Sequence, residues 1–248
     1  MISIITICRN NSIELNNTIL SYYQFLSDKI EAIVIDGSDN NACHKICLKY
    51  NVKYYKQESS GLYAAMNEGV KLSSGVTIIF MNSGDCFYNS FNLDKIIAKH
   101  SNKLASKIIF GDAVHTYKKF RKAYIYNKDK NIGIDWFPCH QSVFIPRNFL
   151  LSNLFDVNYK VSADTNLQRK AFSSYDYIYL NEVVCEFELG GISSRPLSII
   201  SILKHSNEVF LSRGITRKSY KFKFIAKQLL KLLMIKIIGY ECYLKVLN

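Results

Sequence analysis

Three short runs of apolar residues mark the first third of the chain, at residues 2–8, 31–35 and 76–82. Each run has the length of a strand and is rich in β-branched residues, which predicts strands buried in a sheet. Segments with helical spacing of apolar residues, and one further short strand, lie between and after them. We expect helices at about 13–26, 40–49, 61–73 and 91–100, and the further strand at 52–56. Alternating strands and helices predict a mainly parallel, doubly wound sheet.

The pattern is less regular after residue 100. We expect strands at 107–111, 122–126, 142–145 and 177–185, and helices at about 146–151 and 163–172. No linker or internal repeat separates these segments from the first half, so they predict an extension of the same sheet. Two helical regions follow, at 196–212 and 219–247. The predicted fold is α/β, with a Rossmann-like sheet flanked by helices over residues 1–195 and a helical, basic extension over 196–248.

Positive charge is concentrated at the C-terminal end. The net charge is +12, from 32 Lys and Arg against 20 Asp and Glu, and residues 213–248 hold nine of these cations and one acid. Lys223, Lys227 and Lys231 recur every four residues among Leu, Ile and Phe. This pattern favours a helix lying in a membrane interface, and a helix packed on the body with its lysines in water is the alternative. No stretch has the ~18–20 uninterrupted apolar residues of a membrane-spanning helix.

Acidic residues follow two of the predicted strands. Asp36 ends the strand at 31–35, and Asp85 lies in the turn after the strand at 76–82. Ligands of doubly wound sheets bind beyond the carboxyl ends of the strands, so both acids are candidates for ligand binding. The alternative for each is a structural role in a turn or at the start of a helix.

Four motifs occur in a recognisable order: ITICRNN at 5–11, VIDGSDN at 34–40, GLYAAMNEG at 61–69 and MNSGD at 81–85. Together they resemble the family 2 inverting glycosyltransferases over about residues 1–195, and most of all the bacterial branch that builds O-antigen, capsule and exopolysaccharide. The resemblance implies the GT-A fold and transfer of a sugar, with inversion, from a nucleotide-diphospho-sugar. The QxxRW motif of polymer-forming members is absent, because the single tryptophan is Trp136, which implies addition of one sugar.

The resemblance also implies a nucleotide site. Asp36 matches the acid that hydrogen-bonds the base or ribose, and a carboxylate can accept from uracil N3–H, so UDP is expected rather than GDP. Thr6 and Arg9 match the other wall of the pocket. Gly61, at a helix entrance where backbone can approach a ligand, and Asn67 complete the expected nucleotide contacts.

Transfer from a nucleotide diphosphate requires neutralisation of the leaving group, which a divalent cation can provide. The resemblance implies that Asp85 ligates Mn²⁺ or Mg²⁺. The family usually has an acidic pair here, whereas this chain has Ser83-Gly84-Asp85, in which only the last acid remains.

Inversion also needs a general base for the acceptor hydroxyl. The segment VSADTNLQRK at 161–170 matches the family position of this base, which makes Asp164 the candidate. Asp112, Asp135 and Asp156 are the rival acids, and an N-terminal helix cap is the structural alternative for Asp164.

Several other residues are expected to contact substrates. His140 and Gln141 match a His-Gln pair beside the active site of similar enzymes, and Asp112 ends a predicted strand that could face the cleft. Arg195, in GGISSR at 190–195, could pair with phosphate oxygens.

The expected acceptor is an oligosaccharide on a polyprenyl diphosphate carrier at the inner face of the cell membrane, where the basic tail would hold a cytoplasmic enzyme. A sugar-nucleotidyltransferase is disfavoured, because CRNN is not a glycine-rich, basic loop for a triphosphate. A nucleic-acid-binding protein is also disfavoured, because the cations lie in a Lys/Leu/Ile tail and are not interleaved with exposed aromatic residues.

Overall fold

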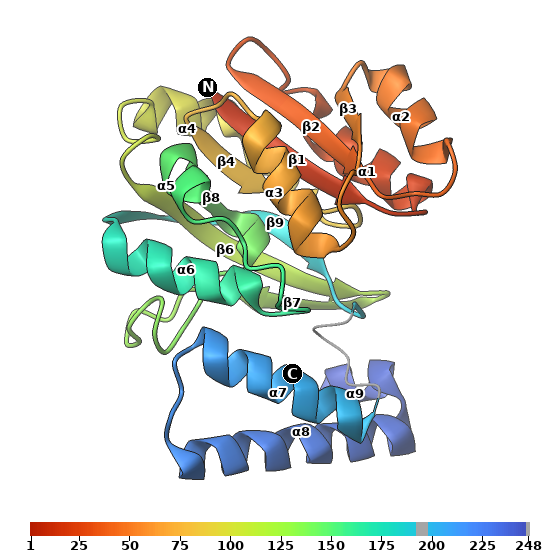
Figure 1. Ribbon diagram of the computed structural model, residues 1–248, viewed down its shortest axis with the longest axis vertical. Helices are drawn as coiled ribbons and strands as arrows, with labels where there is room; N and C mark the ends of the chain where they lie inside the picture. Colours follow the sequence, from red (N-terminus) through yellow and green to blue (C-terminus); the bar gives the residue numbers. More distant parts are fainter. Residues whose placement is uncertain (192–197, 247–248) are drawn as a thin grey trace.

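The computed structural model describes residues 1–191 and 198–246. Within these residues nine strands form one mixed sheet in the order β3-β2-β1-β4-β8-β6-β9-β5, with β7 paired to β6. Helices cover both faces of the sheet, and the last three helices form a layer of their own at one end of the molecule (Figure 1). This arrangement confirms the α/β sheet with a helical extension.

The first half of the chain alternates strands and helices, as its apolar pattern predicts. The strands β1, β2 and β4 are buried along their whole length and pair in parallel. The register sets Cys8 opposite Asp36, so the carboxyl ends of two strands meet at one edge. The elements are β1 (Ile2–Cys8), α1 (Ser12–Tyr23), β2 (Ile30–Asp36), α2 (Ala42–Tyr50), β3 (Lys53–Lys56), α3 (Leu62–Leu72), β4 (Thr77–Phe80), β5 (Cys86–Phe87) and α4 (Leu93–His100).

The second half extends the same sheet with mixed pairing. The strand β8 runs antiparallel between β4 and β6, and β9 runs parallel to β6. The strand expected at 122–126 is β7 at 120–124, because a two-residue turn with Lys118 at φ 50° folds it back onto β6. The elements are β6 (Ile108–Tyr117), β7 (Phe120–Tyr124), the 3₁₀ turn η1 (His140–Ser142), β8 (Val143–Pro146), α5 (Arg147–Ser152), α6 (Ala163–Ser174) and β9 (Tyr177–Glu188).

Apolar side chains fill both faces of the sheet. One core cluster joins the sheet to α1, α2 and α4, and the other joins it to α3, α5 and α6. Gly69 lets α3 approach β1 closely, since a Cβ at this position would lie 2.5 Å from Cγ2 of Ile5. The helix that carries the GLYAAMNEG motif is therefore held tightly against the sheet.

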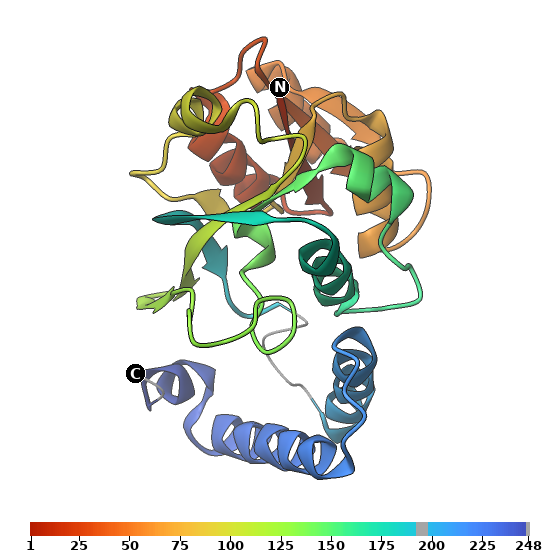
Figure 2. The same cartoon turned by 90° about the vertical axis from the view of Figure 1, so that its left-hand side faces the viewer.

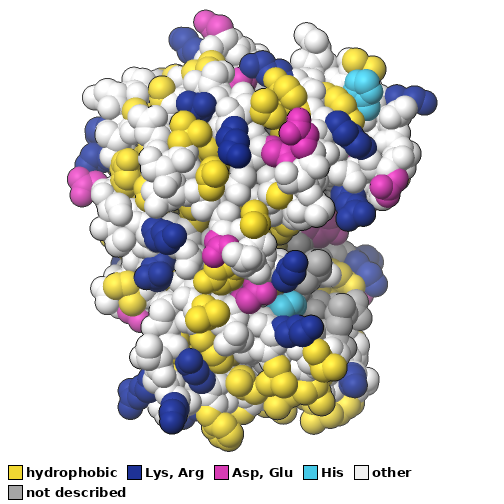
Figure 3. Space-filling view, in the orientation of Figure 1, with side chains coloured by type: hydrophobic (Ala, Val, Ile, Leu, Met, Phe, Trp, Pro, Cys, Tyr) yellow, Lys and Arg dark blue, Asp and Glu magenta, His cyan; other side chains and the backbone are white. Residues whose placement is uncertain are grey.

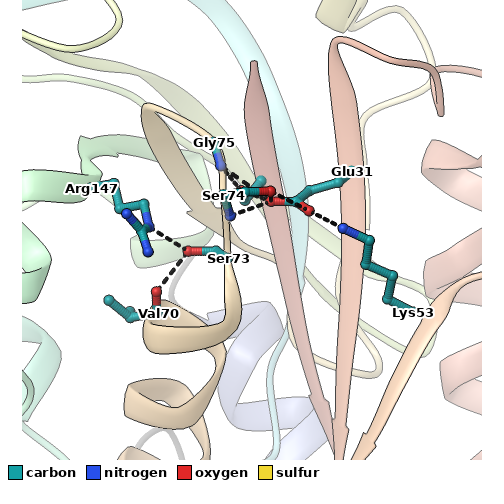
Figure 4. A network of polar contacts seen from close by, with 8 residues as sticks. Glu31, Lys53, Val70, Ser73, Ser74, Gly75 and Arg147 are labelled. Carbon is teal, nitrogen blue, oxygen red and sulfur yellow. Dashed lines mark hydrogen bonds and ion pairs between the residues drawn. The ribbon is translucent and has the colours of Figure 1, made fainter.

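A polar network joins the strands at the end of the sheet opposite to Asp36 (Figure 4). Glu31 accepts hydrogen bonds from the Ser3 hydroxyl and the Ser74 amide and pairs with Lys53 at 2.6 Å. Burial of Glu31 by itself would raise its pKa, but these partners outweigh it and lower the pKa to about 2. Beside it, the Arg147 Nε donates to Ser73 at 3.1 Å. This network joins β1, β2, β3 and the turn before β4.

The helical extension consists of α7 (Ile199–Ser212), α8 (Lys218–Ile238) and α9 (Tyr240–Val246). The single helix expected at 219–247 is interrupted at Gly239, whose φ of 79° ends α8 and allows α9 to turn back. Buried side chains of α8 and α9 pack on Phe120 of the β6–β7 hairpin. Figure 2 shows the three helices α7, α8 and α9 together below the sheet. No helix within 1–191 or 198–246 is long and apolar enough to cross a membrane.

Candidate active site

A cleft of about 600 Å³ opens between α3, α6, η1 and the end of α7. Of its described lining residues, Asp164 is the only acid. The lining comprises Leu62, Tyr63, Met66, Asn82, His115, Tyr124, Pro138, Cys139, His140, Gln141, Lys160, Val161, Asp164, Thr165, Phe187, Gly191 and Arg213. Of the expected site residues, the structure thus brings Asp164, His140 and Gln141 together in one cleft.

Asp164 lies in the first turn of α6 and faces Tyr63 of α3. One carboxylate oxygen accepts from the Thr165 amide at 2.7 Å. Burial raises the pKa of Asp164 to about 6, against the opposing effect of hydrogen bonds from Thr165 and Tyr63. A carboxyl group with this pKa is charged at neutral pH and is a stronger base than an ordinary aspartate, which suits a general base.

His140 has two ring nitrogens without a partner. Its side chain is buried, stacks on Phe80 at 5.0 Å between ring centroids and packs against the edge of Phe155. Both Nδ1 and Nε2 lack a hydrogen bond within the described part of the chain, and burial lowers the pKa of His140 to about 4. A neutral imidazole with unused nitrogens in a cleft is available to a polar ligand. Asn82 Oδ1 is a third buried atom of the lining that has no partner among the described residues.

Asp85 lies beside the cleft, next to Gln141. The Thr18 hydroxyl fixes its turn by donating to the Asp85 carbonyl at 2.8 Å and accepting from the Gly84 amide at 3.0 Å. Burial raises the pKa of Asp85 well above its ordinary range, and the negative charge of Glu188 adds to this rise. Hydrogen bonds from the Glu188 amide and the Gln141 side chain lower the pKa in part. The carboxylate is thus held where a cation would be favoured.

Glu188, at the end of β9, brings a second carboxylate to this turn, and sequence reasoning missed it. Its amide donates to Asp85 Oδ1 at 3.1 Å, and its Oε2 would lie 3.3 Å from a Cβ placed on Gly84. The pairing of β5 with β9 produces this proximity, 103 residues along the chain from Asp85. Two carboxylates form the oxygen-rich set that Mg²⁺ and Mn²⁺ accept, so the residues present fit a divalent cation.

Asp36 is completely buried at the end of β2. Its Oδ1 accepts from the Ser38 amide at 2.8 Å, and its Oδ2 accepts from the Tyr54 hydroxyl at 3.1 Å. Cys8 and Cys43 lie close enough to form a possible metal-ligating group with Asp36. Burial, together with the nearby charge of Asp36, raises the pKa of the Cys8 thiol strongly, so this thiol is protonated and packs as a small apolar group.

The loops after β1 and β2 are joined to each other. The Asn10 amide donates to the Ser38 hydroxyl at 2.7 Å, and the Asn10 side chain exchanges two hydrogen bonds with Asp39. Arg9 is exposed at the start of this pair of loops. Thr6 differs from its expected place, because it is completely buried and its hydroxyl lies 3.2 Å from that of Tyr22. The Thr6 side chain is therefore a core contact under α1.

Gly61 and Asn67 belong to the GLYAAMNEG helix. Gly61 lies at the N-terminal end of α3 with a φ of 111°, and no atom occupies the space of its missing Cβ. Asn67 exchanges two hydrogen bonds of 2.9 Å with the backbone of Phe155. Through these two bonds Asn67 fixes Phe155, which packs against His140.

The rival acids do not line the cleft. Both oxygens of Asp112 are engaged, one by the Tyr126 amide and one by the Tyr179 hydroxyl, each at 2.8 Å. These bonds tie Asp112 to its neighbours in the sheet, outside the lining of this cleft. Asp135 and Asp156 are exposed and bonded to asparagines in their own loops. Arg195 lies outside the described residues.

Arg213, at the C-terminal end of α7, is a cleft residue that sequence reasoning also missed. It comes from the helical extension, whose cations the sequence pattern assigns only to a basic tail. The proximity depends on how α7 packs against α6, and no local motif at Arg213 encodes this.

The chain is similar to known glycosyltransferases in sequence. The model of glycosyl transferase family 2 matches residues 3–154. The chain belongs to glycosyl transferase family 2. This glycosyltransferase is 26% identical over 179 residues to a PGL/p-HBAD biosynthesis glycosyltransferase of Mycobacterium bovis, covering 66% of this chain and 68% of the relative. It is 24% identical over 218 residues to an uncharacterized glycosyltransferase of Mycobacterium tuberculosis, covering 84% and 83%.

Solved structures share the fold of this glycosyltransferase. TarS residues 1–349 from S. aureus, in complex with UDP-GlcNAc, superimposes with a TM-score of 0.65 at 16% identity, covering 92% of this chain and 71% of that one. Glucosyl-3-phosphoglycerate synthase from Mycobacterium tuberculosis, in complex with Mn²⁺, UDP and its product, gives 0.59 at 14% identity, covering 88% and 81%. These likenesses confirm the GT-A type of fold.

Proposed function

We propose that this glycosyltransferase transfers a single sugar, with inversion, from a nucleotide-diphospho-sugar to a lipid-linked oligosaccharide. The observation that carries the proposal is the position of Asp164, the only acid among the described residues of a cleft that also holds unpartnered polar atoms of His140 and Asn82. Such a cleft can hold a sugar, whose hydroxyls would satisfy those atoms.

Asp164 would act as the general base. As the acceptor oxygen bonds to the anomeric carbon, Asp164 takes the proton of that hydroxyl, and the bond to the nucleotide diphosphate breaks with both electrons on the leaving oxygen. With a pKa of about 6, Asp164 is in the base form at neutral pH. His140 and Gln141 would hydrogen-bond the transferred sugar or the acceptor, His140 as a neutral imidazole.

The donor would bind beside this cleft, at the carboxyl ends of β1, β2 and β4. Asp36 Oδ2 accepts one hydrogen bond, from the Tyr54 hydroxyl, and uracil N3–H would donate a second one to it. Arg9 and Gly61 lie in the loops that would border the nucleotide. The complexes of TarS with UDP-GlcNAc and of glucosyl-3-phosphoglycerate synthase with UDP support UDP as the nucleotide.

Mn²⁺ or Mg²⁺ would be held by Asp85, with Glu188 as the second acid. When bound, the cation neutralises the charge that develops on the leaving diphosphate. The Mn²⁺ in the complexes of glucosyl-3-phosphoglycerate synthase and of a Pyrobaculum calidifontis mannosyltransferase with GDP-Man supports this assignment. Glu188 would compensate for Ser83, which replaces the first acid of the usual pair.

The extension would place the enzyme on the inner face of the cell membrane, among anionic lipids. Helix α8 buries Leu232 and Ile235 against its neighbours, yet its outward side is also apolar. At about 100° per residue, the exposed apolar side chains share an arc of about 100°, with Lys223 and Lys236 on its two borders. Figure 3 shows hydrophobic side chains gathered among lysines over this helical layer. This stripe consists of Phe222, Leu229, Leu230, Leu233 and Ile237.

We further propose a role in bacterial surface polysaccharide biosynthesis, of the O-antigen, lipopolysaccharide or capsule kind. Support comes from the combination of a cleft of about 600 Å³ with an exposed apolar stripe, and from the four motifs of the first half. In this proposal residues 1–195 form the catalytic domain and residues 196–248 the basic extension.

Titration calorimetry with UDP and with GDP, each in the presence of Mn²⁺, tests the donor half of the proposal. We expect UDP to bind more tightly, because one carboxylate matches the single N–H of the uracil edge. Tighter binding of GDP would contradict the assignment of Asp36, and absence of binding by both nucleotides would contradict a nucleotide-sugar donor.

A further inference from the structure

The end of α7 is fixed to the catalytic part of the molecule. Glu208 of α7 accepts hydrogen bonds from the backbone amides of Lys160 and Val161, each at 2.9 Å. One helical turn further on, the Arg169 Nε of α6 donates to the Ser212 carbonyl at 2.8 Å. These bonds join α7 to the segment that leads into Asp164. The residue after Ser212 is therefore held in a defined position at the cleft.

That residue is Arg213, and its charge is not used within the described part of the protein. Its guanidinium lies over the ring of Phe137, 5.0 Å from the centroid, and its Nε is buried without a hydrogen-bond partner. Within the described residues no carboxylate forms an ion pair with it. An arginine that is oriented by an aromatic ring, with donors left over in a cleft, is suited to a planar or tetrahedral oxyanion.

Arg213 shares its cleft with Asp164, the proposed base for the acceptor. Phe137 and Tyr124 adjoin it, and Lys160 brings a second cation to the same cleft, whose single acid is Asp164. Arg9, Asp36 and Gly61, which border the proposed nucleotide position, are not among the lining residues. The cleft therefore brings two cations, Arg213 and Lys160, together with Asp164.

We propose that Arg213, together with Lys160, forms a subsite for a phosphate group of the acceptor, so that the helical extension completes the active site. The inference rests on the proposed function, in which the acceptor is a lipid-linked oligosaccharide. Exposed apolar side chains on the same helix support it, because α7 exposes Ile199, Ile200 and Leu203 at its other end. An acceptor with an anionic head and an apolar tail would contact both features.

Binding of farnesyl diphosphate tests the subsite. It is measured by calorimetry at ligand concentrations below those at which farnesyl diphosphate forms micelles, and in EDTA, so that no metal contributes. Arg213→Gln is expected to weaken this binding at least about tenfold, because a charge-assisted bidentate contact is lost. Arg213→Lys should recover part of the loss, and farnesol should bind equally to all variants. Arg217→Gln, which removes the same charge outside the cleft lining, is the matched control and should bind farnesyl diphosphate like the unaltered protein.

UDP binding in Mn²⁺ separates this inference from the proposed function. We expect Arg213→Gln to keep UDP affinity within about twofold, since the nucleotide lies elsewhere. Unchanged farnesyl diphosphate binding in Arg213→Gln, or no binding by the unaltered protein, would overturn the subsite even if UDP binds. Loss of UDP affinity in Arg213→Gln would also overturn the subsite, because it would show that Arg213 contacts the donor diphosphate and not the acceptor. A protein that binds farnesyl diphosphate but not UDP would contradict the proposed donor and leave the subsite standing.

Discussion

The sheet and the helical extension differ in which side chains they bury and which they expose. Residues 1–191 expose 15 large hydrophobic side chains, whereas the much shorter stretch 198–246 exposes 11. The sheet part instead buries polar groups, among them Asp36, Asp85, Asp112 and His140. Burial of polar groups costs free energy unless partners compensate, and exposure of apolar groups favours association. In the proposed function the sheet therefore carries the chemistry and the extension contacts the membrane, with Arg213 at their junction.

The largest effect is expected from Asp164→Asn. Loss of a general base typically costs ~10²–10⁴-fold in rate, so transfer should fall at least about a hundredfold. UDP affinity should stay within a few-fold, and binding to phosphatidylglycerol vesicles should not change. The free energy of unfolding should fall by no more than about 1 kcal/mol, because the asparagine Oδ1 can still accept the hydrogen bond from the Thr165 amide.

Asp156→Asn is the matched control, since Asp156 is exposed and outside the cleft. It should transfer sugar like the unaltered enzyme. If Asp164→Asn kept full transfer activity and altered only the melting temperature, Asp164 would only stabilise the first turn of α6, and it would not be the general base.

The next effect concerns Asp85→Asn. Removal of a cation ligand should weaken UDP binding in Mn²⁺ by about tenfold or more, and leave UDP binding in EDTA unchanged. Glu188→Gln should act in the same direction but less strongly, because Glu188 is exposed and better screened. Mn²⁺ affinity measured by electron paramagnetic resonance should decline in the same order. Equal Mn²⁺ affinity in all three proteins would show that neither acid is a ligand.

The smallest effect is expected in the extension, from Phe222→Ser combined with Leu233→Ser. Both side chains are more than half exposed, so melting should hardly change. Loss of two inserted apolar side chains should weaken co-sedimentation with phosphatidylglycerol vesicles by about tenfold. Leu48→Ser, an equally exposed residue on the sheet part, is the control. Unchanged co-sedimentation of the double variant would show that α8 only packs on the protein and does not bind lipid. The difference in exposed apolar side chains between the two regions would then not reflect membrane binding.

Much of the fold could be predicted from the sequence because its signals are local. The strands β1, β2 and β4 are continuous apolar runs, and α6 begins within a residue of its expected start at 163. The two-residue strand β5 is too short to leave a pattern. The break at Gly239 was missed because the apolar and basic residues continue beyond it, although a glycine at positive φ commonly ends a helix.

The site was predictable where a motif carried it and not where distant segments meet. Asp164 and His140 lie in motifs and do share the cleft. Asn67 reaches a backbone partner 88 residues away, and Glu188 approaches Asp85 over 103 residues, so no local pattern could reveal either contact. These long-range contacts follow from sheet pairing and helix packing.

The pH dependence of transfer is the most direct test of the central claim that Asp164 is the base of this cleft. Its pKa is raised to about 6, so the base form is present above that pH and is lost as pH falls through it. The rate at saturating donor and acceptor should therefore be level above pH 7 and decline about tenfold per pH unit below about 6. A rate that stays constant from pH 7 to pH 5, where Asp164 would be protonated, would contradict the account.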